Sequence, residues 1–199
     1  MLDHVFTDAI GALRDAMENA LLERIAMEEQ FQTDVLLGDL SWETSYGLPG
    51  EGRPPKVRAD VSLYWSTWSQ AAFRSWYLAE ELPDHPSIDI EVGLRIQRLA
   101  NPPEPEKVFS VLPEESAPLG EETLERSGPT VETLYDTDLH ALEHAIEVTY
   151  EGVYELDEET LADGSLLDEH FKAMGGWIAS VLVRLGDLDF EFLAPSERD

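Results

Sequence analysis

The clearest spacing of metal-ligating residue types in this chain is His140-Ala-Leu-Glu143-His144. The order matches the inverted zinc motif H-x-x-E-H, and Glu147 would share its helical face. The motif requires a helix, because two imidazoles one turn apart must converge on one metal ion. Strict alternation of apolar and polar residues begins by Ile146, which favours a strand. We interpret the histidines as surface or sheet-facing residues, and a His/Glu metal-dependent hydrolase is the enzymatic alternative.

Other patterns that would support catalysis fail on residue type or spacing. If Gly164 took the sixth position of a calcium loop, Leu161 and His170 would occupy two ligand positions. The acidic residues between Asp157 and Glu169 are better explained as helix caps. The chain has no cysteine, no glycine-rich phosphate loop and no Gly-x-Ser-x-Gly motif. The sequence predicts a protein that is not an enzyme, with no catalytic residue, metal ligand or cofactor.

Aromatic residues are the most informative feature, and most of them lie between two expected strands. One interpretation is a core cluster, since tryptophan is mostly buried. The other is a partly exposed groove that binds apolar polypeptide or another subunit. The candidate client- or partner-binding residues are Trp65, Trp68, Phe73, Trp76, Tyr77, Tyr150 and Tyr154.

The formal net charge of −29 over 199 residues limits the possible partners. Such a field repels nucleic acid and anionic membrane, so neither is an expected partner. It suits a basic protein partner, but solubility or adaptation of a whole proteome to salt would also explain it. The chain does not start with a basic signal segment and has no long apolar run, so we expect a cytoplasmic location.

The elements that must position these residues include three amphipathic strands. Residues 57–66, 88–97 and 146–156 alternate apolar and polar side chains, with structure resuming near Leu142. One covered and one wet face is typical of an antiparallel sheet. Apolar residues of segment 2–29 recur at three and four positions, which predicts an amphipathic helix that covers the sheet or pairs with a copy of itself.

The remaining segments have weaker patterns. Residues 31–46 are expected to form a strand with a bulge at Gly38, followed by a loop at 47–55. A capping box at Thr67–Gln70 favours a helix that ends near Pro83, although the alternation there also permits a strand. After residue 156 we expect a helical turn capped by Asp157, then a helix that opens at Ser165–Asp168 and breaks or kinks at 175–176.

We predict an α+β fold, an antiparallel β-sheet with helices packed on one face. Residues 1–30 are expected to form an N-terminal amphipathic helix, and residues 31–199 a single α+β domain. Within that domain, residues 101–129 are rich in proline and glutamate and form a loose excursion on the surface that buries little.

The C-terminal quarter resembles the SecB-type export chaperones and their toxin–antitoxin-linked relatives. The matching features are Ala145-Ile-Glu-Val-Thr-Tyr-Glu-Gly-Val-Tyr-Glu-Leu156, an acidic linker, Leu167-Asp-Glu-His-Phe171, and a helix leading to Leu193-Ala-Pro195. The resemblance implies a four-stranded antiparallel sheet backed by helices, a dimer or tetramer, and a groove for unfolded or secreted clients. Leu142, Ile146, Val148, Tyr150 and Tyr154 would then lie on the sheet face.

These observations predict a non-enzymatic acidic binding protein, a SecB-like or secretion-type chaperone that holds unfolded or secreted polypeptides. Its expected partners are proteins, either clients or a basic partner, and we expect it to form a homo-oligomer. The alternative binding role is an adaptor in an assembly such as a phage tail or a secretion component.

Overall fold

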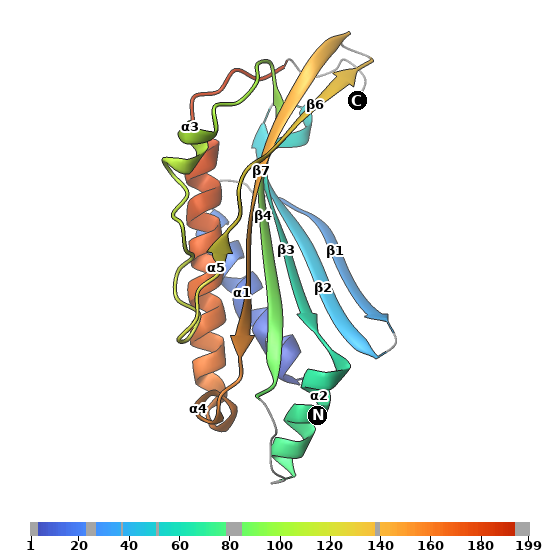
Figure 1. Cartoon of the computed structure of the whole chain (residues 1–199), viewed down its shortest axis with the longest axis vertical. Coiled ribbons are helices and arrows are strands. Elements are labelled where there is room, and N and C mark those ends of the chain that lie inside the picture. Colours follow the sequence, from blue (N-terminus) through green and yellow to red (C-terminus); the bar gives the residue numbers. More distant parts are fainter. Residues whose placement is uncertain are drawn as a thin grey trace.

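A computed structural model describes residues 4–22, 27–36, 38–50, 52–78, 85–137 and 140–193. It contains a seven-stranded sheet in the order β1-β2-β3-β4-β7-β5, with β6 also paired to β7 (Figure 1). In chain order the elements are α1 (His4–Leu21), β1 (Met27–Leu36), β2 (Asp39–Gly50), β3 (Gly52–Trp65), α2 (Thr67–Tyr77), β4 (Ser87–Leu99), α3 (Pro105–Phe109), β5 (Glu125–Arg126), β6 (Thr130–Asp136), β7 (Ala141–Glu155), α4 (Glu158–Ala162) and α5 (Gly164–Gly186).

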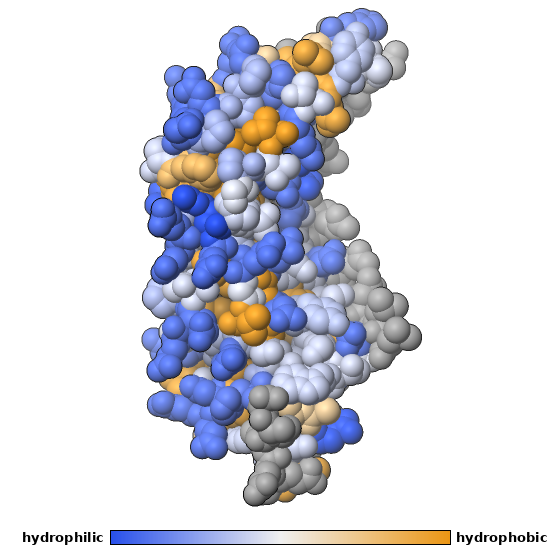
Figure 2. Space-filling view, in the orientation of Figure 1, coloured by the Kyte–Doolittle hydropathy of each residue, from blue (hydrophilic) through white to orange (hydrophobic). Residues whose placement is uncertain are grey.

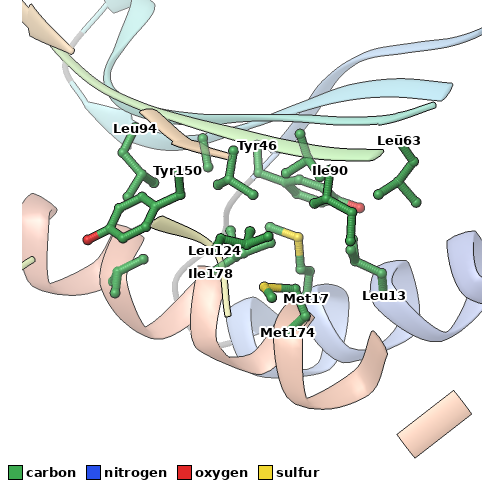
Figure 3. Packing of buried hydrophobic residues seen from close by; sticks show 14 of the residues in the cluster. Leu13, Met17, Tyr46, Leu63, Ile90, Leu94, Leu124, Tyr150, Met174 and Ile178 are labelled. Atoms are coloured by element: carbon green, nitrogen blue, oxygen red, sulfur yellow. The ribbon is translucent and has the colours of Figure 1, made fainter. Parts of the chain in front are cut away.

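The core lies between one face of the sheet and the helices α1 and α5, which pack against each other on that face (Figure 1). Figure 3 shows side chains from the strands meeting Leu13 and Met17 of α1 and Met174 and Ile178 of α5. Described strand pairings are all antiparallel. The predicted α+β class, with an antiparallel sheet and helices on one face, is confirmed. The four-stranded sheet that the SecB resemblance implies is wrong, because the described sheet has seven strands.

The three amphipathic strands form the centre of the sheet as predicted, in β3, β4 and β7. Their apolar residues, such as Val61, Val92 and Val148, are buried beneath the helices, while the alternate residues lie on the opposite face. We call this second face the open face, because no described helix packs against it. Alternation of period two thus determines which side chains meet the helices and which meet solvent.

The N-terminal region differs from the prediction in two ways. Helix α1 ends at Leu21, and residues 27–29, expected to be helical, belong to β1. The single strand expected at 31–46 is a hairpin of β1 and β2, in which Leu36 pairs with Asp39 and Gly38 has φ 95°. Gly38 is therefore a turn residue with a positive φ and not a bulge. The pairing of β1 with β2 determined this, and it outweighed the strand propensity of the segment.

The loop expected at 47–55 is also wrong, because β2 continues to Gly50 and β3 begins at Gly52. The prolines lie near the start of β3, where they tolerate strand geometry. One of them has a structural role: the carbonyl of Pro55 accepts a hydrogen bond of 2.6 Å from the amide Nε2 of Gln97. The segment expected to be a loop is therefore the turn end of the long hairpin formed by β2 and β3.

Segment 67–77 forms the helix α2, as preferred, and the extended alternative is wrong. The N-cap is Ser66, one residue before the expected position, and its hydroxyl accepts a 3.1 Å hydrogen bond from the Ser69 N–H. Asp39 adds to this start by accepting bonds from the backbone N–H and the hydroxyl of Thr67. The cap explains why the aromatic segment turns helical immediately after β3.

Segment 101–129 has little regular structure, only α3 and the short β5, but it packs more closely than expected. Its apolar residues Val108, Leu112, Leu119 and Leu124 are buried in the main core. The strand β6 that follows was not predicted. Its signal is the alternation of Val131, Thr133 and Tyr135, which the proline- and glutamate-rich context obscured.

The C-terminal helices follow the prediction except at the start of α5 and at the glycine pair: the capping box expected at Ser165–Asp168 is wrong, because α5 begins at Gly164 with Asp163 as its N-cap. Asp157 caps α4 by accepting a 2.7 Å hydrogen bond from the Thr160 N–H, and Asp163 caps α5. Helix α5 then runs without interruption through Gly175 and Gly176, so the expected break is wrong. Gly175 instead allows close approach of α1, because a Cβ there would lie 2.5 Å from the Leu13 carbonyl oxygen.

Candidate functional site

Most of the aromatic residues predicted to bind a partner lie in the core. Trp65, Tyr150 and Tyr154 are fully buried, Phe73 is buried, and Trp76 is partly buried against the same cluster. Trp65 lies between Phe6 and Phe73, at ring-centroid distances of 5.8 and 6.0 Å. For these residues the core interpretation holds, and only Trp76 keeps part of its surface accessible.

The hydroxyls of the two buried tyrosines have hydrogen-bonding partners within the protein. The hydroxyl of Tyr150 donates a 2.5 Å hydrogen bond to the Pro113 carbonyl, and burial raises the pKa of Tyr150 to about 12. The hydroxyl of Tyr154 lies 2.8 Å from Nδ1 of His170, and burial raises the pKa of Tyr154 as well. Tyr150 therefore links segment 110–124 to β7, and Tyr154 links α5 to β7. Neither side chain is available to contact a client.

Two of the predicted residues are exposed, and both belong to α2. Trp68 is 50% exposed and Tyr77 is 61% exposed, and Leu78 next to Tyr77 is also exposed. Because Trp68 is the second residue of α2 and Tyr77 the last, they lie at opposite ends of the helix and do not form one continuous binding surface in the way the sequence pattern suggested.

The histidine motif does not form a metal site. His140 lies in a turn with φ 49°, and His144 lies in β7, where its Nδ1 is 2.8 Å from the Thr133 hydroxyl. Glu147 is three residues further along the strand, so it points to the other face and pairs with Arg95. Within the described ranges, no three His, Cys, Asp or Glu side chains are arranged to hold a metal ion.

The open face of the sheet contains a hollow of about 590 Å³. Its floor consists of two neighbouring rows of residues that are paired across β3, β4 and β7. The apolar part of the floor is formed by Tyr64 and Val153, which are both exposed. Its lining residues are Ser62, Tyr64, Asp89, Ile90, Glu91, Glu125, Arg126, Ser127, Glu151, Gly152 and Val153.

Three glutamates stand side by side across the hollow. Glu91 of β4 pairs directly with Glu151 of β7, and Glu151 pairs with Glu125 of β5. Directly opposed residues of antiparallel strands point to the same face, with Cβ atoms about 5 Å apart. Like charges in this arrangement destabilise a sheet. We call these residues the glutamate row.

Three carboxylates elsewhere on the open face have arginine partners. Arg58 pairs with Asp60 at 2.8 Å, and Arg95 contacts both Glu132 at 2.5 Å and Glu147 at 2.8 Å. No such ion pair involves the glutamate row or Asp89 in the part of the chain that the structure describes. The open face is therefore divided into an electrostatically paired half and an unpaired half, and the hollow lies in the unpaired half.

Arg126 lines the hollow, but internal contacts hold its guanidinium. One nitrogen donates to the Leu112 carbonyl, and the guanidinium carbon lies 4.2 Å from the centre of the Phe109 ring. This arrangement anchors β5 at the wall of the hollow. Gly152 also lines the hollow, and segment 123–124 packs closely on it, because a Cβ at this position would lie 2.7 Å from a methyl of Leu124 and 3.2 Å from the Thr123 carbonyl.

Asp89 lies in the row next to the glutamates, between Tyr64 and Val153. Partial burial raises the pKa of its carboxyl above the ordinary value. A raised pKa means that the charged form opposes folding, and this cost disappears as the pH falls through that pKa. A cation bound in the hollow would stabilise the charged form of this carboxyl.

The glutamate row was not predicted from the sequence. Each of its members appears as one of many acidic residues on an amphipathic strand, and only the register between strands brings them together. The alternation itself was a usable signal, since it placed Glu91 and Glu151 on the polar faces of their strands.

Searches of protein-family models, curated proteins and solved structures found no match for this chain.

Proposed function

We propose that this protein is a non-enzymatic binding protein, a SecB-like or secretion-type chaperone. In this proposal the hollow on the open face holds a positively charged, extended segment of an unfolded or secreted polypeptide. The observation that supports it most directly is the glutamate row, Glu91, Glu151 and Glu125. It lies beside two exposed apolar residues and forms no ion pair with any residue that the structure describes.

The chemistry of the hollow matches such a segment. Lysine or arginine side chains would neutralise the opposed carboxylates and remove the repulsion between them. The exposed Tyr64 and Val153 offer apolar contact to neighbouring side chains of the client, and Tyr64 is held in place by a 2.7 Å hydrogen bond that its hydroxyl donates to Asp39. A net charge of −29 would attract basic clients over a distance and keep the complex soluble.

The order of elements at the C-terminus also supports a chaperone of this kind. A long last strand, a short acidic helix and a longer helix follow one another in β7, α4 and α5, which is the order that the SecB resemblance implies. No helix in the described ranges is long and apolar enough to cross a membrane.

The test is binding of a fluorescently labelled Lys- and Arg-rich peptide by the full chain, measured by anisotropy. We expect the double variant Glu91→Gln and Glu151→Gln to raise Kd about tenfold, because two charge interactions are lost. The same variant should unfold at a higher temperature, because its opposed charges are gone. Loss of binding with a gain of stability would identify a binding role and not a defect in folding.

The matched control is the double variant Glu121→Gln and Glu122→Gln, which removes the same charge from an exposed turn outside the hollow. It should leave Kd nearly unchanged. If both double variants weaken binding equally, the peptide binds the net charge of the protein and the proposed site is wrong.

An aggregation assay with an unfolded client distinguishes a chaperone from an adaptor. A chaperone should suppress aggregation of a reduced, unfolded basic protein at near-stoichiometric ratio, and Glu91→Gln with Glu151→Gln should reduce this activity. An adaptor would show no such activity and would bind one folded partner.

A further inference from the structure

Strand β6 is an edge strand, and no described strand pairs with its outer side. On its inner side it pairs with β7. Val131, Leu134 and Tyr135 are 46%, 57% and 59% exposed. Edge strands are usually protected by charged side chains, above all lysine, by proline or by a bulge. Residues 130–136 contain neither lysine nor proline, and one of their two acidic residues, Glu132, is paired with Arg95 of its own chain. An exposed apolar edge of this kind is a template for another strand.

The position of β6 leaves this edge accessible. With the start of β7 it forms an arm that extends beyond the end of α5 along the long axis of the molecule (Figure 1). Figure 2 shows apolar surface on this arm, which stands apart from the largely hydrophilic surface of the body. A second protein can therefore approach β6 without displacing the helices.

One face of the arm is mainly apolar and is interrupted by the paired Thr133 and His144. Val131 pairs with Ile146, and Tyr135 pairs with Leu142, which is also exposed. Since Ile146 lies on the face of the sheet that the helices cover, Val131, Tyr135 and Leu142 continue that face beyond the helices. The opposite face of β6 contains Glu132 and Leu134.

We propose that β6 pairs antiparallel with β6 of a second copy of this chain, with Thr133 opposite Thr133 of the partner subunit. In this register each Val131 lies opposite a Tyr135, and each Glu132 lies opposite a Leu134. Aromatic residues opposite β-branched residues, and threonine opposite threonine, are favourable pairs. The strand is thus complementary to itself.

Other registers are less favourable. A slip of one residue joins the apolar face of one copy to the polar face of the other. Centring the pair on Glu132 places two glutamates opposite each other, and centring it on Leu134 places Glu132 opposite Asp136. Both arrangements oppose like charges. The register centred on Thr133 avoids these costs and joins Ile146, Val131 and the partner's Tyr135 in one apolar row.

This inference does not depend on the proposed function, because the arm contains no residue of the hollow. The test is sedimentation velocity of the full chain over a wide concentration range at low and high NaCl. We expect a dimer whose Kd falls as salt rises, since each copy has a net charge of −29. A monomer under all conditions would overturn the proposal.

Charge at position 134 provides a matched pair of variants. Leu134→Glu would face Glu132 of the partner subunit and should raise the dimer Kd about tenfold or more, whereas Leu134→Lys would attract that residue and should preserve the dimer. Equal effects of both variants would contradict the register. Because Leu134 also pairs with Glu143 of its own chain, thermal unfolding of both variants must show that the arm is folded.

A crosslink tests the register independently. The chain has no cysteine, so Thr133→Cys introduces a single thiol that would lie opposite its own copy. Opposed residues in an antiparallel pair have Cα atoms about 4.5–5.5 Å apart, within disulfide range. We expect a covalent dimer on mild oxidation. Leu142→Cys, also exposed on the same face but one strand away from the edge, should remain monomeric under the same oxidation, and a reversed result would overturn the proposal.

Discussion

Two neighbouring glycines of α5 show how much a single position depends on what lies opposite it. A Cβ at Gly175 would lie 2.5 Å from the Leu13 carbonyl oxygen and 3.0 Å from Cβ of Ala16, both in α1. A Cβ at Gly176 would meet no atom within 4 Å. The two positions share the same helical backbone, so they separate the effect of packing from that of helix propensity.

We predict opposite effects of alanine at these two positions. Gly175→Ala should destabilise the protein by about 2 kcal/mol, because α1 must move away from α5. Gly176→Ala should stabilise it by about 0.5–1 kcal/mol, because alanine lowers the conformational entropy of the unfolded chain. Urea unfolding followed by circular dichroism measures both. If Gly175→Ala were as stable as Gly176→Ala, the close crossing of the two helices would be wrong.

At the scale of elements, α2 follows β3 directly and contains aromatic residues of two kinds. Trp65 at the end of β3 and Phe73 in α2 are core residues, whereas Trp68 lies on the outer side of the helix. Spacing along the chain does not distinguish them. The position of the N-cap distinguishes them, because Ser66 determines where α2 begins and therefore which of its side chains face the sheet.

We therefore predict different consequences for two tryptophans only three residues apart. Trp65→Ala should destabilise the protein by about 3–5 kcal/mol through the cavity it leaves beside Phe6 and Phe73. Trp68→Ala should change stability by no more than about 0.5 kcal/mol. Thermal unfolding gives both values. A large loss of stability in Trp68→Ala would place that side chain in the core.

At the scale of the whole molecule, the dominant feature is the negative charge, since the chain has 42 acidic and only 13 basic residues. Part of this charge is compensated locally, as at Arg95 with Glu132 and Glu147. The rest produces repulsion within the folded state that salt reduces.

We predict that the midpoint of thermal unfolding rises by about 5 °C between low salt and roughly 0.5 M NaCl. The double variant Glu91→Gln and Glu151→Gln should show a smaller rise, because it lacks one of the closest like-charge pairs. Differential scanning calorimetry measures both. An unchanged midpoint in the unmodified protein would mean that the acidic surface contributes little to stability.

The sequence by itself determined the elements with a strong period. Alternation of apolar and polar residues predicted β3, β4 and β7 and the face that each one buries, and helical spacing predicted α1, α2 and α5. These predictions succeeded because the pattern of burial along one element is a local property of its residues. The same reasoning placed Glu91 and Glu151 on exposed faces without relating one to the other.

Only the tertiary structure decided what lies next to what. The hairpin turn at Gly38, the uninterrupted helix at Gly175 and the edge strand β6 all depend on partners that are distant in the sequence. The glutamate row depends on the register of β4, β7 and β5, and a slip of one residue would separate its members onto opposite faces. Register is a property of pairs of strands, and a single strand contains no record of its neighbour.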